Sequence, residues 1–240
     1  MNTRNAIIMA LLAGATTNLG VLFTFFSKSR VREVISTSLA FAMGVMSLIS
    51  IKELIPTSIK YFILNLSISW ALIVIIIIPI IIFIGIKWFK KRIDKDNHLY
   101  TVGILNMFSL LLHNLPEGII VFTSSIASRE LGLKIAISIA AHNLPEGICI
   151  AVPIYYSTNN RKKAFLYTFL SGVADPIGAI VTWLFLKPYI SILFLNVMFY
   201  FVGILMIFIS LLEILPEARS YHRKFYILLG LLLALFILIM

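Results

Sequence analysis

The hexapeptide HNLPEG occupies residues 113–118 of the chain and occurs again at residues 142–147. Each copy lies inside an apolar stretch long enough to cross a bilayer, which takes about 20 residues in a helix. The repeat therefore places two histidines and two glutamates where ionisable groups are rare and usually mark the path of an ion or substrate. Imidazoles, carboxylates and amides are ligands that a borderline divalent metal accepts. The pattern predicts a metal site within a membrane.

The composition is that of a membrane protein. Of the 240 residues, 60% are hydrophobic and 12% are charged, and the mean hydropathy is +1.03. A soluble domain is nearer a quarter charged. Apolar runs recur along the whole length and leave no room for a sizeable soluble domain. We expect an all-α integral membrane protein in which residues 1–240 form a single transmembrane domain, with a short cytoplasmic loop at about 87–98.

The apolar runs predict eight transmembrane helices. The third run carries no ionisable group between residues 73 and 86, so we expect it to face lipid. The eight predicted spans are 5–26, 34–57, 62–86, 99–126, 132–157, 164–186, 189–214 and 224–240.

The basic residues predict the orientation of these spans. The net charge is +10, but Lys and Arg fall in short clusters between apolar runs, which argues for lipid contact and against a nucleic-acid partner. The loops after the first, third, fifth and seventh spans hold 14 of them, and the opposite side holds 5. Positively charged loops stay in the cytoplasm. We expect a multi-pass protein of the cell membrane with both termini outside. The single cysteine, Cys149, excludes an intrachain disulfide framework.

A second repeat flanks the central pair. Residues 44–56 resemble residues 203–216, which are one residue longer, and both segments end in Glu-apolar-apolar-Pro. The predicted topology puts Glu53 near the outer face and Glu213 near the inner face. Spans 1–3 and 6–8 would then be inverted repeats around spans 4 and 5, a 3+2+3 arrangement common in secondary transporters. Because the repeat is short and apolar, chance similarity is the alternative.

Helical spacing groups the polar residues of the central motif. Residues four apart lie one turn above each other, so His113 shares a face with Glu117, and His142 with Glu146. Each pair could share one cation. The asparagine of each copy lies about 100° around the helix, where a second ion or a neighbouring helix could use it.

Depth predicts that the two motifs meet. Glu117 and His142 lie 12 and 13 residues from Arg129 in the turn between them, or about 18–20 Å along each helix. Asp175, before Pro176, is a third acid at similar depth. A lone histidine or glutamate there could be a simple interhelical hydrogen bond, but two identical copies favour a site. The predicted metal ligands are His113, Asn114, Glu117, His142, Asn143, Glu146 and Asp175. The predicted transport path, on weaker grounds, includes Glu53, Met46, Asn106, Glu213 and Glu217.

These motifs resemble those of the ZIP (Zrt-, Irt-like protein) family of divalent-metal transporters, in its bacterial and archaeal branch. The resemblance covers nearly the whole chain and implies eight spans with both termini outside. It also implies a two-metal site in spans 4, 5 and 6, to which the seven ligands above correspond. Asp175 stands where the family usually has glutamate, which shortens the carboxylate by one methylene and puts a second metal in doubt. The family further suggests a homodimer, with metal as substrate and no cofactor.

We therefore expect a transporter, not an enzyme, that moves Zn²⁺, or else Fe²⁺, Mn²⁺ or Co²⁺, into the cytoplasm by alternating access. Glu53 would collect the ion outside, and Glu213 with Glu217 would receive it inside. One rival is an intramembrane metal-dependent hydrolase, which also wants three ligands and an open position. No H-E-x-x-H motif supports that rival. A proton- or anion-linked carrier is disfavoured, because paired asparagines add nothing to a proton relay.

Overall fold

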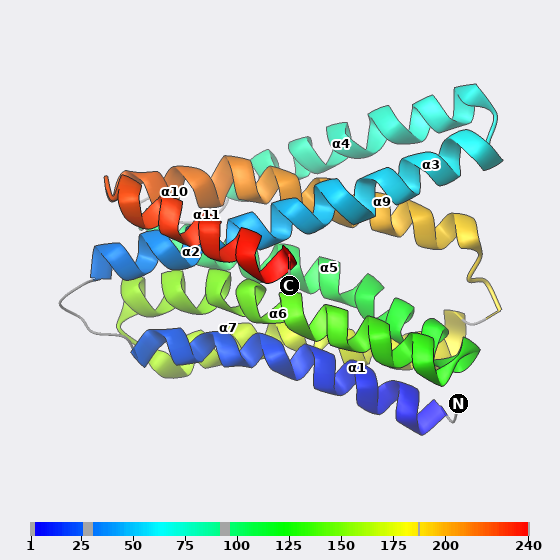
Figure 1. Cartoon of the computed structure of the whole chain (residues 1–240), viewed down its shortest axis with the longest axis horizontal. Helices are drawn as coiled ribbons and strands as arrows, with labels where there is room; N and C mark the ends of the chain where they lie inside the picture. The colour runs from blue at the N-terminus through cyan, green and yellow to red at the C-terminus, as the bar shows by residue number, and fades with distance from the viewer. Residues whose placement is uncertain (1–2, 26–30, 92–96, 187, 240) are drawn as a thin grey trace.

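A computed structural model describes residues 3–25, 31–91, 97–186 and 188–239, and every regular element in these residues is helical. Figure 1 shows long helices lying side by side, with the N terminus at one end of the bundle. In chain order they are α1 (Thr3–Thr17), η1 (Asn18–Phe25), α2 (Val31–Ile49), η3 (Ser50–Leu54), α3 (Ile55–Asn65), α4 (Ile68–Lys90), α5 (His98–Ala127), α6 (Arg129–Thr158), α7 (Arg161–Gly172), α8 (Ala174–Val181), η4 (Thr182–Leu186), α9 (Ile192–Ile209), η5 (Ser210–Ile214), α10 (Leu215–Ser220) and α11 (Lys224–Ile239).

Seven of the described spans are long and apolar enough to cross a membrane, and an eighth helix is shorter. The 16 residues of α11 extend about 24 Å, less than the roughly 30 Å of a hydrocarbon core. Accordingly, the C terminus lies near the middle of the bundle in Figure 1. The structure thus confirms an all-helical membrane protein, with seven long apolar spans and a shorter apolar helix among the described residues.

The predicted end of the second span at residue 57 was wrong. The helix continues from Val31 to Asn65, and the third span begins at Ile68 instead of residue 62. A proline usually ends a helix because it lacks an N–H group. Pro56 is tolerated because it lies in the first turn of α3, directly after the π-helical turn η3. The chain turns at Leu66, whose backbone is extended.

The seventh and sixth spans also contain a proline, and the helix continues past it in one span but breaks before it in the other. The seventh runs through η5 and α10 to Ser220, beyond its predicted end at residue 214. The sixth has close to its predicted bounds but breaks at Val173, between α7 and α8 and three residues before Pro176. This break places Asp175 in the first turn of α8.

Both halves of the flanking repeat contain a π-helical turn of five residues, η3 and η5. Each turn begins with a serine, carries its glutamate at the fourth position and precedes a proline by two residues. Single π-helical turns in α-helices often occur at functional sites, because the extra residue changes the direction of the side chains. The repeat therefore has a structural counterpart in the positions of Glu53 and Glu213.

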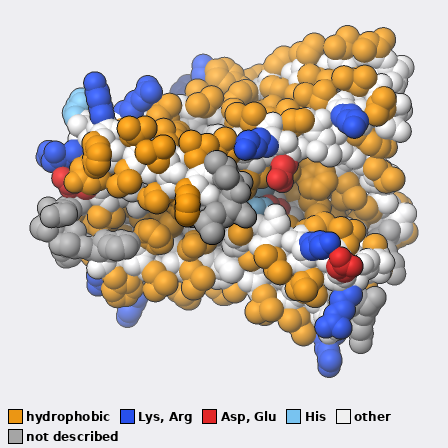
Figure 2. Space-filling model, viewed as in Figure 1, with side chains coloured by type: hydrophobic (Ala, Val, Ile, Leu, Met, Phe, Trp, Pro, Cys, Tyr) orange, Lys and Arg blue, Asp and Glu red, His pale blue; other side chains and the backbone are white. Residues whose placement is uncertain are grey.

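Helix α4 is the span expected to face lipid, and most of its side chains are exposed and apolar, as that expectation requires. Figure 2 shows that hydrophobic side chains cover most of one face of the molecule. The connection after α4 is shorter than the predicted loop 87–98, because α4 continues to Lys90. Some basic residues used for the orientation lie outside the described residues: Lys28, Arg30, Arg92, Lys95 and Lys187.

The helices form two packed groups. In one, α1, α7 and α8 pack around α5 and α6; in the other, α2, α3, α4, α10 and α11 pack with α9 and one another. A single residue, Ser128, joins α5 to α6, and its hydroxyl accepts the N–H of Leu131 to cap α6. So short a connection makes α5 and α6 antiparallel neighbours. Both HNLPEG motifs lie in this pair.

Candidate metal site

The two motifs meet in the middle of the α5–α6 pair. Nε2 of His113 lies 3.0 Å from Oε1 of Glu117 and 3.1 Å from Oε1 of Glu146, and Nε2 of His142 lies 2.7 Å from Oε1 of Glu117. All four side chains are buried. Glu117 therefore contacts an imidazole from each copy of the motif, as the predicted convergence requires.

Three ligand atoms, one each from His113, His142 and Glu146, lie within 4.8 Å of one another. Zinc bound tetrahedrally at 2.0–2.1 Å holds its ligands about 3.3 Å apart. Small side-chain rotations would therefore bring these three atoms onto one ion. Glu117 is close enough to serve as a fourth ligand or to accept a hydrogen bond from a bound imidazole.

The two asparagines are oriented by neighbouring helices. Nδ2 of Asn114 donates to the carbonyl of Ser171 at 3.2 Å. Nδ2 of Asn143 donates to the carbonyl of Ala13 at 3.0 Å and to Oδ2 of Asp175 at 2.9 Å. The amide nitrogens thus bind α7, α1 and α8, which leaves both amide oxygens free to accept.

Several buried atoms of this cluster have no hydrogen-bond partner among the described residues. They are Nδ1 of both histidines, Oε2 of Glu117 and of Glu146, and Oδ1 of Asn114, Asn143 and Asp175. Buried polar atoms are normally satisfied. Three carboxylates in one buried cluster also concentrate negative charge, which a divalent cation would balance. The donor set of nitrogen and oxygen atoms without sulfur fits a first-row divalent metal.

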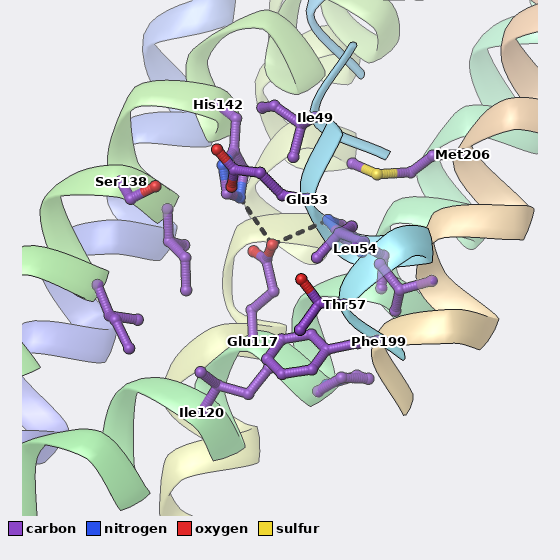
Figure 3. A pocket seen from close by; sticks show the side chains of 15 residues that line it. Ile49, Glu53, Leu54, Thr57, Glu117, Ile120, Ser138, His142, Phe199 and Met206 are labelled. Carbon is purple, nitrogen blue, oxygen red and sulfur yellow. Dashed lines mark hydrogen bonds and ion pairs between the residues drawn. The ribbon is translucent and has the colours of Figure 1, made fainter. Parts of the chain in front are cut away.

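A cavity of about 240 Å³ leads to this cluster. Its walls come from the second half of α5, the first half of α6, residues 199–206 of α9 and the segment around η3, so it extends from the cluster toward the end of the bundle that holds the N terminus. Glu53, Glu117 and His142 point into it (Figure 3). In Figure 2, a hollow lies near the middle of the face turned toward the viewer, and acidic and histidine side chains are visible in it. Glu53 thus lies between the cluster and that end.

The two acids predicted at the inner side lie elsewhere and have partners. Both oxygens of Glu213 accept hydrogen bonds from Nζ of Lys90, at 2.9 and 2.7 Å. Oε2 of Glu217 lies 2.5 Å from Nδ1 of His98, and its Oε1 accepts the hydroxyl of Tyr221 at 2.9 Å. Neither acid lines the cavity described above.

Two further residues of the predicted path also lie outside the cavity lining. Met46 is buried in the apolar core. Asn106 is buried too, and its Nδ2 donates to the carbonyl of Cys149 at 3.0 Å. Met46 therefore packs in the apolar core, and Asn106 makes a hydrogen bond between α5 and α6.

Comparison with known proteins decides the family. A model of the ZIP zinc transporters matches residues 89–239, more than half of the chain. The chain belongs to the ZIP family. The ZIP resemblance of the motifs is thereby confirmed, and membership makes the protein a multi-pass membrane transporter, not an enzyme. The hydrolase alternative is excluded on this ground.

Relatives of this ZIP protein span almost its whole length. It is 36% identical over 234 residues to the zinc transporter ZupT of Streptococcus mutans, covering 91% of this chain and 89% of that protein. It is 33% identical over 257 residues to ZupT of Chlorobium luteolum, covering 96% and 94%. It is 33% identical over 263 residues to ZupT of Clostridium perfringens, covering 96% and 92%.

Some residues that the structure of this ZIP protein places near the path were not predicted from the sequence. Met206 lines the cavity, and its sulfur accepts a hydrogen bond from the hydroxyl of Ser50 at 3.4 Å. Thr57 and Ser138 line it as well. Lys90 was counted only as a basic loop residue. Its contact with Glu213 joins residues 123 positions apart, and no local pattern indicates such a pair.

Proposed function

We propose that this chain transports Zn²⁺ into the cytoplasm through the cluster formed by the two HNLPEG motifs. The observation that carries the proposal is the convergence of His113, Glu117, His142 and Glu146, the first three of which line a cavity. The zinc named in its relatives agrees with this nitrogen and oxygen donor set. The same ligands would also accept Fe²⁺, Mn²⁺ or Co²⁺, so the order of preference has to be measured.

The proposed ligands are the seven predicted residues, in two roles. His113, His142, Glu117 and Glu146 hold the transported ion, since their atoms are already close together. The oxygens of the two asparagines and Oδ1 of Asp175 are buried without partners and complete the coordination of that ion or of a second one. These three have their other atoms fixed by hydrogen bonds, which pre-organises the site.

The proposed cycle is alternating access with both termini outside. Glu53, exposed in the cavity, attracts the ion from the outer side, and the cluster binds it at mid-depth. The bundle then opens toward Glu213 and Glu217, which accept the ion on the cytoplasmic side. The Lys and Arg bias of the loops supports this direction, and the inverted repeat supplies matching acids for the two sides.

Uptake of radiolabelled Zn²⁺ into proteoliposomes tests the proposal. Glu146→Gln should reduce the initial rate by about a hundredfold or more, because it removes a charged ligand. Glu130→Gln is the matched control, since Glu130 lies in the same helix but is exposed and paired with Lys134. Equal uptake by the two variants would refute the site. Competition by Mn²⁺, Fe²⁺ and Co²⁺ would rank the cargoes.

We also propose a homodimer, which rests on the family resemblance alone. The exposed apolar surface of α4 is compatible with either lipid or a second copy of the chain. The mass of the purified protein in detergent, measured by light scattering with the detergent subtracted, decides between one chain and two.

A further inference from the structure

The two acids of the π-helical turns, Glu53 and Glu213, occupy matching positions of the repeat but have different surroundings. Glu53 is exposed in the cavity and has no hydrogen-bond or ion-pair partner among the described residues. Glu213 is 2% exposed, and both of its oxygens accept hydrogen bonds from Lys90. One carboxylate is therefore free for a cation, whereas the other already holds one.

Lys90 reaches Glu213 from the end of α4. It is the last residue of that helix, whose terminal carbonyls favour a nearby cation, and α4 packs beside α9. Its side chain is 40% exposed, so the ammonium remains within reach of water or lipid headgroups. Because the ammonium lies at the exposed edge of the pair, the flexible lysine stem can swing away when another cation takes its place at Glu213.

We propose that Lys90 is a gating residue, a tethered cation that closes the route past Glu213 until a metal ion replaces it. This proposal rests on the proposed inward transport of Zn²⁺. It adds that Lys90 controls the last step, which is the passage of the ion by Glu213 into the cytoplasm. A divalent ion bound to Glu213 would lie next to the ammonium, and two cations repel strongly in a low-dielectric site. Lys90 therefore has to withdraw before Glu213 can accept the ion.

The exchange also explains why the gate closes again. A buried carboxylate without a partner is unfavourable, so Glu213 holds either Lys90 or the metal ion. Loss of the ion to the cytoplasm leaves Glu213 free to take Lys90 back. The arrival of cargo and the opening of this end are thereby coupled through one pair of charges.

Other contacts at the same end agree with a closed gate. Glu217, one turn after Glu213, is buried and contacts both His98 and Tyr221. Both acids of this end are therefore occupied by side chains of the protein. The cavity that reaches the cluster runs toward the opposite end.

The alternative is that the Lys90–Glu213 ion pair only stabilises the packing of α4 against the other helices. Loss of a purely structural ion pair would lower stability but would not change which end of the protein is open. Loss of a gate would favour the opposite conformation, in which the outer cavity is covered. Accessibility of the outer cavity therefore distinguishes the two roles.

The test uses a cysteine reporter in the full chain, held in zinc-free lipid nanodiscs. Thr57→Cys places a thiol on the exposed lining of the cavity, in a Cys149→Ala background. We expect Lys90→Gln to slow labelling of this thiol by a maleimide about threefold or more, as the open population falls. Lys87→Gln, in the same helical turn, should not slow it, because Lys87 lies over the Phe83 ring instead. Lys90→Arg keeps the cation and should label at the wild-type rate.

Labelling of Lys90→Gln at the wild-type rate would overturn the gate, whether or not its melting temperature falls. Glu213→Gln removes the other half of the pair and should give the same slowing, so the test remains decisive if Lys90→Gln fails to fold. The assay requires no transport. Absence of Zn²⁺ uptake by the wild type would refute the proposed function without altering the labelling result.

Discussion

Asn143 links the metal cluster to two other helices through one side chain. Its amide nitrogen donates to Ala13 of α1 and to Asp175 of α8, and its oxygen is left without a partner among the described residues. Asn114 makes one such bond, to Ser171 of α7. The second copy of the motif therefore depends more on its neighbours than the first.

We expect Asn143→Asp to destabilise the metal-free protein more than Asn114→Asp does. The first change puts a carboxylate beside Asp175 and removes two donated hydrogen bonds, whereas the second removes one. Each buried group left unsatisfied costs about 1–3 kcal/mol, and like charges add to that cost.

Thermal unfolding in detergent with a chelator measures the difference, and added Zn²⁺ should restore part of the loss in Asn143→Asp. Unchanged melting of metal-free Asn143→Asp would show that this amide does not hold the helices together.

The residue-scale predictions succeeded where spacing along one helix sets geometry. The i,i+4 spacing of His113 and Glu117 predicts one shared face, and the structure places them 3.0 Å apart. The ligand role of these residues stays a prediction. Periodicity could not reveal the pairing of Lys90 with Glu213, because that contact depends on how α4 packs against α9.

At the scale of helices, the last residue of each motif allows a close contact between backbones. A methyl group at Gly118 would overlap the carbonyl of Asp175 in α8, and one at Gly147 would overlap the carbonyl of Thr17 in α1. Small residues allow such close approach in membranes, where apolar burial does not drive helix association. Gly85 in α4 has nothing within 4 Å of an added methyl group.

We therefore expect Gly118→Ala and Gly147→Ala to lower stability by about 1–3 kcal/mol each, the usual cost of overpacking. Both should also reduce Zn²⁺ uptake, because the displaced helices carry the ligands. Gly85→Ala is the matched control and should be neutral or slightly stabilising, since alanine favours a helix over glycine. Thermal unfolding and uptake of the three variants check this, and equal behaviour of all three would contradict the packing role.

Helix boundaries were the part of the fold that the sequence predicted least well. The second span was predicted to end at residue 57, directly after Pro56, but the helix continues through a π-helical turn and this proline to Asn65. A π-helical turn holds one more residue than an α-helical turn, and no local preference in the sequence indicates it. By contrast, the span order and the α5–α6 hairpin followed directly from apolar run length and the short connection.

At the scale of the whole molecule, the two ends of the described structure differ. The cavity extends from the cluster toward the end that holds the N terminus, and paired acids lie toward the other end. The orientation of these ends in the membrane stays a prediction, based on the charge of the loops. That the entire chain forms one transmembrane domain also stays a prediction.

Cysteine accessibility in intact cells tests the orientation. In a Cys149→Ala background, Lys60→Cys should react with a membrane-impermeant thiol reagent, because the exposed Lys60 lies toward the N-terminal end. Lys162→Cys, exposed at the other end, should react only after permeabilisation. The reverse pattern would show that the termini lie in the cytoplasm and that the proposed direction of transport is wrong.

The central claim is that the cargo ion binds where the two motifs meet. Anomalous diffraction at the zinc edge from crystals of the metal-loaded protein tests it most directly. The account predicts a peak at about 2.0–2.2 Å from ligand atoms of His113, His142 and Glu146. A transport-competent protein whose zinc peaks all lie away from these three side chains would contradict it.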